Sequence, residues 1–339
     1  ATTVAATVTL DSAGQTVLTN GGSVQISVVD AGTTTNLNLH LSGSSLVDAG
    51  GNTYAYSGGV ITLSEAAPGN GNTISVTATE TDINNNVSSQ GTASATQHTA
   101  LPDTPTVSIP EANASGVITA AALNGATSVS ATVTLDSTDQ TDLTAGGTVH
   151  VTVVDAGTTT NLALHLSGSS LIDAGGNTYG YSGGVITLAE AAPGNGNTLS
   201  VTASETDVYG NVSASASASA TQHSVLPDTP TVKITTDTNQ DGVISAPELN
   251  GATNVAATVT LDAIGQTDLT AGGTVHVTVV DAGTTTKLAL QLSGSRLIDA
   301  GGNTYGYSGG VITLAEAAPG NGNTISVTAT ETDVYGNAS

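Results

Sequence analysis

The sequence contains no cysteine, methionine, tryptophan or phenylalanine, and only three of its 339 residues are basic. The absence of cysteine excludes disulfides and thiolate metal sites, and it fits either a reducing cytosol or a surface protein stabilised in another way. No run of about 18 apolar residues occurs, so we expect no direct membrane insertion. The start of the chain lacks a charged-then-apolar signal peptide, so we expect any targeting segment to lie outside these residues.

The charge of the chain is strongly one-sided. Against 27 acidic residues stand only Lys233, Lys287 and Arg296, which gives a net charge of −24. Nucleic acids and anionic membranes bind through Lys and Arg, so this balance argues against both as partners and favours cations. An apolar fraction of 38% is enough to build folded cores, which argues against disorder.

Three near-identical units make up most of the chain. The string "YSGGVITL" begins at residues 56, 181 and 307, and the matching blocks run over 1–88, 126–213 and 252–339. Each block consists of short runs rich in Val, Ile and Thr, separated by Gly, Asn, Asp and Pro clusters that are typical of turns. No segment shows a convincing long helical period. The pattern predicts an all-β fold of antiparallel sandwiches.

The connectors between the blocks set the predicted domain boundaries. Residues 213–225 alternate strictly and predict a closing strand, whereas "LPDTP" at 101–105 and 226–230 predicts a stiff hinge because each proline fixes its own φ. We therefore expect tandem Ig-like antiparallel β-sandwich domains over residues 1–100, 101–225 and 226–339, forming an extended rod in which neighbouring repeats are each other's partners. On this phasing the first domain lacks its opening strand and the last lacks its closing strand.

One stretch departs from the β pattern and has the spacing of a calcium loop. In "DTNQDGVISAPEL" (237–249), Gly242 occupies the sixth position, where a 12-residue loop turns sharply. The six oxygen-bearing positions are then Asp237, Asn239, Asp241, the Val243 carbonyl, Ser245 and Glu248. The sequence predicts a Ca²⁺ site here, used inside a β-domain because "APELNGAT" allows one helical turn at most. A polar turn between two strands is the alternative.

The counterpart one repeat earlier is degenerate. Residues 111–122 place Glu111, Asn113 and Ser115 at positions one, three and five, with Gly116 at six and Ala122 at twelve. Since the last carboxylate is missing, we expect weak calcium binding or none.

A second acidic motif ends each block, as "ETDINNN" at 80–86 and "ETDVYGN" at 205–211 and 331–337. It supplies further candidate ligands together with the hinge aspartates, namely Glu80, Asp82, Asn86, Asp103, Glu205, Asp207, Asn211, Asp228, Glu331, Asp333 and Asn337. We expect Asp207 to lie near the opening hinge of its own domain, beside Asp103 and Glu111, where a cation would offset crowded negative charge. A solvated polar turn is the alternative.

The combination of "TPTV", the loop at 237–248 and "GVITLAEAAPGNGNTLSVTASETDVYGN" resembles the bacterial Ig-like repeats of giant type I-secreted surface adhesins, including biofilm-associated and RTX adhesins. The resemblance covers all three units. It implies spacer repeats at the bacterial cell surface, with Ca²⁺ at or near domain junctions. It also implies that a host-cell, surface or matrix ligand is bound by domains outside these residues. The chain departs from the family in the 111–122 loop, in Asn84-Asn85 and in a long inserted loop.

Catalysis is not expected. No nucleophile–base pair occurs, and the copies do not keep their histidines, since His40 and His165 correspond to Gln291 in the third. The Gly-rich "GNGNT" lacks a phosphate-binding lysine. The leading hypothesis is thus a calcium-stiffened extender segment of a cell-surface adhesin, with a role in cell adhesion and biofilm formation.

Two alternatives remain open. The chain is a structural subunit of an extracellular filament if domains that lack strands complement one another between chains. It is itself adhesive if Tyr179 and Tyr181, with their copies, form a binding surface, although such tyrosines more often pack at strand edges.

Overall fold

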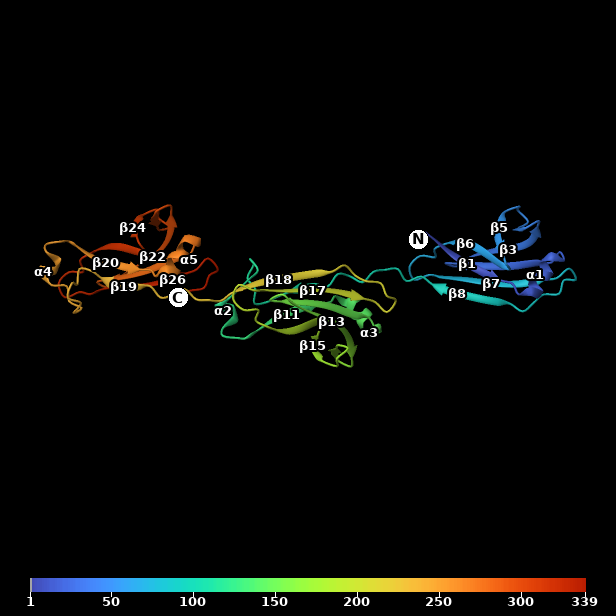
Figure 1. Cartoon of the computed structure of the whole chain (residues 1–339), viewed down its shortest axis with the longest axis horizontal. Helices are drawn as coiled ribbons and strands as arrows, with labels where there is room; N and C mark the ends of the chain where they lie inside the picture. The colour runs from blue at the N-terminus through green and yellow to red at the C-terminus, as the bar shows by residue number, and fades with distance from the viewer. Residues whose placement is uncertain (1) are drawn as a thin grey trace. The chain divides into compact units, whose positions relative to one another are not determined.

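The computed structural model describes residues 2–339, which form two compact units (Figure 1). The first comprises Ala1–Pro102 with Tyr209–Asn211, and the second comprises Asp103–Val208 with Val212–Ser339. Strands dominate both units, so the predicted all-β class with sandwich-like domains in tandem is confirmed. No helix among residues 2–339 has the length and apolar character needed to cross a membrane.

The first unit contains one eight-stranded sheet in the order β1-β6-β5-β4-β3-β2-β7-β8. Its strands are β1 Thr3–Thr9, β2 Ser23–Asp30, β3 Thr33–Ser42, β4 Ser45–Val47, β5 Thr53–Ser57, β6 Val60–Ala66, β7 Thr73–Thr81 and β8 Gly91–Thr96.

The second unit contains two sheets built on the same plan. The ten-stranded sheet has the order β10-β18-β17-β12-β13-β14-β15-β16-β11-β9. Its strands are β9 Thr106–Ser108, β10 Val117–Thr119, β11 Ser128–Thr134, β12 Thr148–Asp155, β13 Thr158–Ser167, β14 Ser170–Ile172, β15 Thr178–Ser182, β16 Val185–Ala191, β17 Thr198–Thr206 and β18 Ala216–His223. The following eight-stranded sheet has the order β19-β20-β25-β24-β23-β22-β21-β26. Its strands are β19 Thr231–Ile234, β20 Asn254–Thr260, β21 Thr274–Asp281, β22 Thr284–Ser293, β23 Arg296–Ile298, β24 Thr304–Ser308, β25 Val311–Ala317 and β26 Ile325–Thr332.

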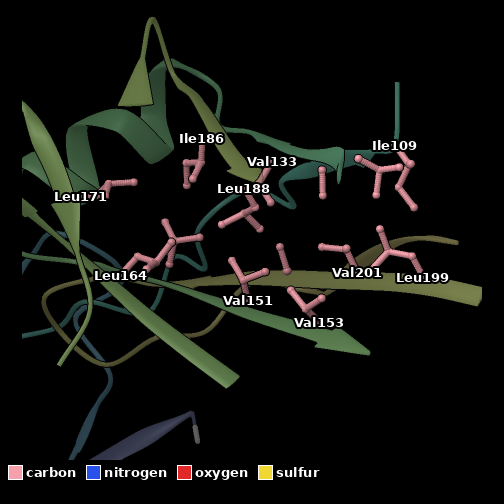
Figure 2. Close-up of a cluster of buried hydrophobic side chains, with 14 of the residues drawn as sticks. Ile109, Val133, Val151, Val153, Leu164, Leu171, Ile186, Leu188, Leu199 and Val201 are labelled. Atoms are coloured by element: carbon pink, nitrogen blue, oxygen red, sulfur yellow. The ribbon is translucent and has the colours of Figure 1, made fainter. Parts of the chain in front are cut away.

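Alternation along each strand separates the core from solvent. In β12, every second residue of "TVHVTVVD" is buried, so one face of the strand meets the core. Figure 2 shows the two layers of this core, with Ile186 and Leu188 of β16 facing Val151 of β12 and Val201 of β17. The β2–β3 hairpin turns on two residues, Ala31 and Gly32, with φ of 43° and 83°. Both angles are positive, as the twist of a two-residue hairpin requires.

Each of the three sheets has a core of its own, and we call these parts the first, second and third domains in chain order. Each domain also carries one helix that the sequence analysis missed. These helices are α1 Ser12–Thr19, α3 Ser137–Ala145 and α5 Ala263–Ala271. Each begins after an aspartate whose side chain accepts a hydrogen bond from the first turn, as Asp136 does from the backbone N–H groups of Thr138 and Asp139. The helices are only two turns long, too short for a clear apolar period. Their local signals were the aspartate cap and, for α3 and α5, the left-handed glycines Gly146 and Gly272 at the C-terminal end. The remaining helices, α2 Ala120–Leu123 and α4 Ala246–Leu249, are single turns, as expected for "APELNGAT".

Strands β9 and β10 close the seam of the ten-stranded sheet. β9 pairs antiparallel with β11, and β10 pairs parallel with β18, so these two strands, which correspond to β1 and β8 of the first unit, are not at the edges of their sheet. In the first unit, β1 and β8 stay at the edges, and no strand within residues 2–102 covers them.

Candidate metal sites

The 237–248 loop folds around its own carboxylates. Gly242 has a φ of +81° and donates its N–H to Asp237 Oδ2 at 3.0 Å. Asp241 donates its N–H to Asn239 Oδ1 at 3.0 Å, and its own Oδ1 accepts from the Val243 N–H at 2.8 Å. The positive φ and these short-range bonds wrap the chain tightly over positions one to seven, as the spacing predicts.

Glu248 folds back across this loop from α4. One carboxylate oxygen accepts from the Ser245 N–H at 2.8 Å and from its hydroxyl at 2.7 Å. The other accepts from the N–H and hydroxyl of Thr238, both at 3.0 Å. These donors, first of all the Ser245 N–H, lower the pKa of Glu248 to about 2. The carboxylate is therefore ionised and spans the beginning and the end of the loop.

The donor set of the loop fits a hard cation. Asp237 is 9% exposed, and its Oδ1 is buried with no hydrogen-bond partner. Calcium takes carboxylate, amide and carbonyl oxygens, which this loop supplies. In the geometry of residues 2–339, however, no three His, Asp or Glu side chains already converge as a metal-binding group. Binding would therefore draw Glu248 away from its present donors.

The counterpart loop has the same turn at its glycine but fewer charges, and its residues Val117–Thr119 form strand β10. Gly116 again has a positive φ, of 73°, and Asn113 Oδ1 accepts from the Ser115 and Val117 N–H groups. Glu111 accepts from the Ser130 N–H at 3.0 Å, while Ala122 is exposed at the twelfth position. Glu111 is the one carboxylate in this loop. Weak or absent calcium binding by residues 111–122 stays a prediction.

Carboxylates also gather where the chain enters the second domain. Asp103, at the hinge, is held beside Asp136, the cap of α3, which raises the pKa of Asp103. Burial raises the pKa of Asp142 on α3, and the nearby charges of Asp207 and Asp103 raise it further. The structure thus brings Asp207 and Asp103 to the same helix. Glu111 is occupied at Ser130 instead and is not among the groups that perturb this cluster.

We call the carboxyl groups of Asp103, Asp136, Asp139, Asp142, Glu205 and Asp207 the hinge cluster. Two of its members are fully buried. Glu205 is 0% exposed and Asp139 is 1% exposed, and no N–H or hydroxyl group of another residue donates to either carboxylate. The two carboxyl groups lie within hydrogen-bonding reach of each other. Burial, followed by the adjacent Asp139, raises the pKa of Glu205 to about 9. A buried carboxylate without donors or a counter-charge costs free energy, which is why the group favours its neutral form.

The third domain repeats this hinge cluster with one difference. Asp228 lies beside Asp262, as Asp103 does beside Asp136, which raises the pKa of Asp228. Glu331 is 3% exposed, and burial raises its pKa to about 7. Gly265 stands where the second domain has Asp139, and a side chain there would collide with the Glu331 carboxylate.

In the first domain the same place holds fewer carboxylates. Burial and the charge of Asp11 raise the pKa of Glu80, and Gly14 stands at the position of Asp139. Asp82 accepts from the Asn86 side chain at 2.8 Å, and this bond lowers the pKa of Asp82.

The asparagines of the closing motifs brace the chain and are not free ligands. Asn337 is 2% exposed, donates to the His223 carbonyl at 2.9 Å and accepts from the Ala120 N–H at 2.8 Å. Its loop is tightened by Asp333, which accepts from the Asn337 side chain at 2.8 Å. In the first unit, Asn211 donates to the His98 carbonyl at 3.3 Å.

Two histidines that the sequence analysis did not single out, His98 and His223, have a specific role in packing. His98 stacks on Tyr209 and His223 on Tyr335, each pair with ring centroids 3.6 Å apart. The available signal was that "TQH" and "VYGN" recur together, whereas the first block has Asn84-Asn85 in place of Tyr-Gly. The inserted-loop tyrosines pack instead: Tyr179 and Tyr181 lie against the core, and Tyr179 donates to Asp173 at 2.9 Å.

Comparison with known proteins yields structural likeness only. No protein-family model matches the chain, and no curated protein matches it in sequence. A 1.5-MDa bacterial ice-binding adhesin, described for its retention at the host cell surface, is 17% identical, with 100% of this chain and 88% of that chain covered and a TM-score of 0.37. A Ca²⁺-stabilized adhesin that helps an Antarctic bacterium reach out and bind ice is 20% identical, with coverage of 100% and 66% and a TM-score of 0.35. The chicken interferon gamma receptor alpha chain is 10% identical, with coverage of 59% and 84% and a TM-score of 0.26. None of these matches places the chain in a family.

Proposed function

We propose that this chain is a calcium-stiffened spacer segment of a bacterial cell-surface adhesin, exposed outside the cell and without catalytic activity. Repetition of one β-domain three times supports a mechanical role, since catalysis needs one site and gains nothing from near-identical copies. The sequence resemblance to bacterial Ig-like adhesin repeats supports the location, the secretion by the type I route and the contribution to cell adhesion and biofilms. In this role, ligands on host cells, surfaces or matrix are bound by other domains of the adhesin.

The observation that carries the proposal is the buried pair of carboxyl groups in the second domain, which have only each other as hydrogen-bond partners. The neighbours of Asp139 and Glu205 are also acidic. A protein that folds without a cation has little reason to keep such a pair, because it must either bury a second negative charge or keep Glu205 protonated well above its usual pKa, and both cost free energy. A divalent cation would supply the missing counter-charge through oxygen ligands.

The position of the hinge cluster explains how a cation would stiffen the chain. Asp103 belongs to the hinge segment, Asp136 and Asp142 to α3, and Asp207 to the loop after β17. Carboxylates from these three segments would share one ion, which would tie the hinge to the body of its domain. In the third domain Asp268 lies on α5 near Asp333, whose charge adds to burial in raising the pKa of Asp268. Asp228, Asp268 and Asp333 would hold an ion there in the same way, and the 237–248 loop would add a site after β19.

The test is a calcium titration by calorimetry on the whole chain, with thermal melts in calcium and in EDTA. We expect several binding events and a lower melting temperature in EDTA; an ion that binds only the folded state adds about 2.7 kcal/mol at a hundredfold excess over Kd. Asp103→Asn removes one exposed hinge ligand, and Glu65→Gln is a matched loss of charge outside the hinge clusters. If calcium produces no heat and the melts coincide, the calcium part of the proposal is wrong.

A further inference from the structure

A polar cavity of about 280 Å³ lies on the sheet of the first domain. We call it the outer-face cavity. Its lining includes Gln25 and Ser27 of β2, Asn36 and Asn38 of β3, Thr79 of β7, and Gln90, which precedes β8. These six side chains are all amides or hydroxyls, and among residues 2–339 no ionisable side chain lines the cavity. The cavity therefore offers hydrogen-bonding groups without charge.

The strand register brings these side chains together. Strand β2 buries alternate residues in the core, so Gln25 and Ser27 face away from it. Gln25 stands opposite Asn38 of β3 on one side and Thr79 of β7 on the other, and Ser27 stands opposite Asn36. Residues directly opposite on one face of a sheet have Cβ atoms about 4.5–5.5 Å apart. The polar groups thus form neighbouring rows on the same face of the sheet.

The amides of the outer-face cavity have unused hydrogen-bonding capacity. The four residues that carry them are exposed, and within residues 2–339 none of their side chains bonds to another group of the chain; they are Gln25, Asn36, Asn38 and Gln90. At the same place in the second domain, Thr152 donates to the side-chain oxygen of Asn161 at 2.8 Å. A carboxamide has two donor hydrogens and an acceptor oxygen, so the first domain presents both functions to a ligand.

The lining is specific to the first domain, although the three repeats are nearly identical. Both later repeats have histidine in place of Gln25 and alanine in place of Asn38, and the second has serine in place of Gln90. The replacements are His150, Ala163 and Ser215 in the second domain, with His276 and Ala289 in the third. The strands pair in the same register in all three domains, so pairing alone does not require amides here.

We propose that the outer-face cavity binds a neutral carbohydrate of one or two sugar rings. Sugar hydroxyls both donate and accept hydrogen bonds, and the amides and hydroxyls of the lining offer both functions. The net charge of −24 disfavours anionic ligands, and a cationic ligand finds no carboxylate in the lining. Cavities for small molecules measure about 300–1,000 Å³, so this one suits the smallest of such ligands. Carbohydrate binding here would add a weak contact to the spacer role and requires neither calcium nor the hinge cluster.

The test is a titration of the isotope-labelled whole chain with glucose, galactose, mannose and N-acetylglucosamine, each followed by NMR. We expect at least one sugar to shift the signals of β2, β3 and β7 saturably, with a Kd on the order of 1 mM. The second and third domains of the same chain are internal controls, and their signals should not shift.

Two variants that borrow residues from the other repeats sharpen the test. Gln25→His combined with Asn38→Ala gives the first domain the residues of the second, so the fold is kept, and binding should weaken about tenfold or more. His40→Gln, the residue that the third domain has at this position, changes β3 outside the cavity and should leave binding unchanged.

Three results overturn the proposal. They are the absence of any saturable shift with all four sugars, equal shifts in the three domains, and binding that the double variant does not weaken. Calcium binding is measured separately by calorimetry, so failure of carbohydrate binding and failure of the calcium-stiffened spacer are distinguished.

Discussion

Replacing Glu205 by glutamine should have opposite effects on stability without calcium and with it. The side chain is fully buried, and its pKa in the folded protein is about 9. An unfolded glutamate titrates near 4.5, so between these values the folded state holds one more proton than the unfolded state. The free energy of unfolding therefore falls as pH rises through this window. Glutamine is neutral and nearly the same shape, and its amide can donate to the Asp139 carboxylate without the proton that Glu205 must keep to do so.

The size of the effect follows from the pKa difference. At pH 7.5 the unfolded glutamate is three pH units above its pKa, and each unit is worth about 1.4 kcal/mol, so keeping the folded group protonated costs at most about 4 kcal/mol. Relaxation and water penetration reduce such costs, so we expect Glu205→Gln to stabilise the calcium-free protein by about 2 kcal/mol. In calcium the variant lacks one carboxylate ligand, and its stabilisation by the ion should be smaller than that of the wild type.

Denaturant unfolding in EDTA and in saturating calcium at pH 5.5, 7.5 and 9 measures both effects. Hydrogen exchange in β17, which carries Glu205, assigns the change to the second domain. Glu65→Gln, in β6 of the first domain, controls for the loss of one negative charge. A Gln variant that is less stable than the wild type in EDTA at pH 7.5, with an unchanged pH dependence, would refute the reasoning.

Three further predictions follow from the same contacts. Because the pKa of Glu331 is about 7, the stability of the calcium-free third domain should fall with rising pH only up to about pH 7. In the second domain, where the pKa of Glu205 is about 9, the fall should continue to about pH 9. Hydrogen exchange of β26 and β17, measured against pH, compares the two domains. Asp241→Ala should remove a calcium-binding event from the calorimetric titration, whereas Asn113→Ala, at the third position of the degenerate loop, should leave every event in place. Asn337→Ala leaves two half-buried backbone groups, the Ala120 N–H and the His223 carbonyl, without these partners and should cost about 1 kcal/mol in unfolding experiments, while Asn86→Ala, which lacks those partners, should cost less.

Much of the fold could be predicted from local sequence because its rules are local. Strict alternation in "TVHVTVVD" places every second side chain in the core, and the structure has that pattern in β12. The sharp turn of the 237–248 loop could also be predicted, since Gly242 stands where the chain has a φ of 81°, although nothing in the sequence indicated the positive φ of 61° at Gln240. Spacing alone did not show that Glu248 would be held by Ser245 and Thr238.

The hinge cluster was only partly predictable because its members come from distant segments. The motif "ETD" drew attention to Glu205 and Asp207, and the hinge to Asp103. Asp139 was not suspected, because a single aspartate in a short polar run gives no sign of burial. Its burial follows from the packing of α3 against the sheet, and α3 itself was missed.

Comparison of the three domains shows what Asp139 adds. Where Asp139 stands, the first and third domains have Gly14 and Gly265, and at both the neighbouring glutamate carboxylate fills the space that a side chain would need. The second domain keeps that glutamate and inserts another carboxylate beside it, which makes its calcium-free state the more costly one. The pKa is about 9 for Glu205 and about 7 for Glu331. The glutamate with the additional acidic neighbour therefore has the higher pKa, as repulsion between like charges predicts. A cation would gain more by neutralising the second cluster than the third. The two hinges of one chain should therefore respond to different calcium concentrations, although the repeats around them are nearly identical.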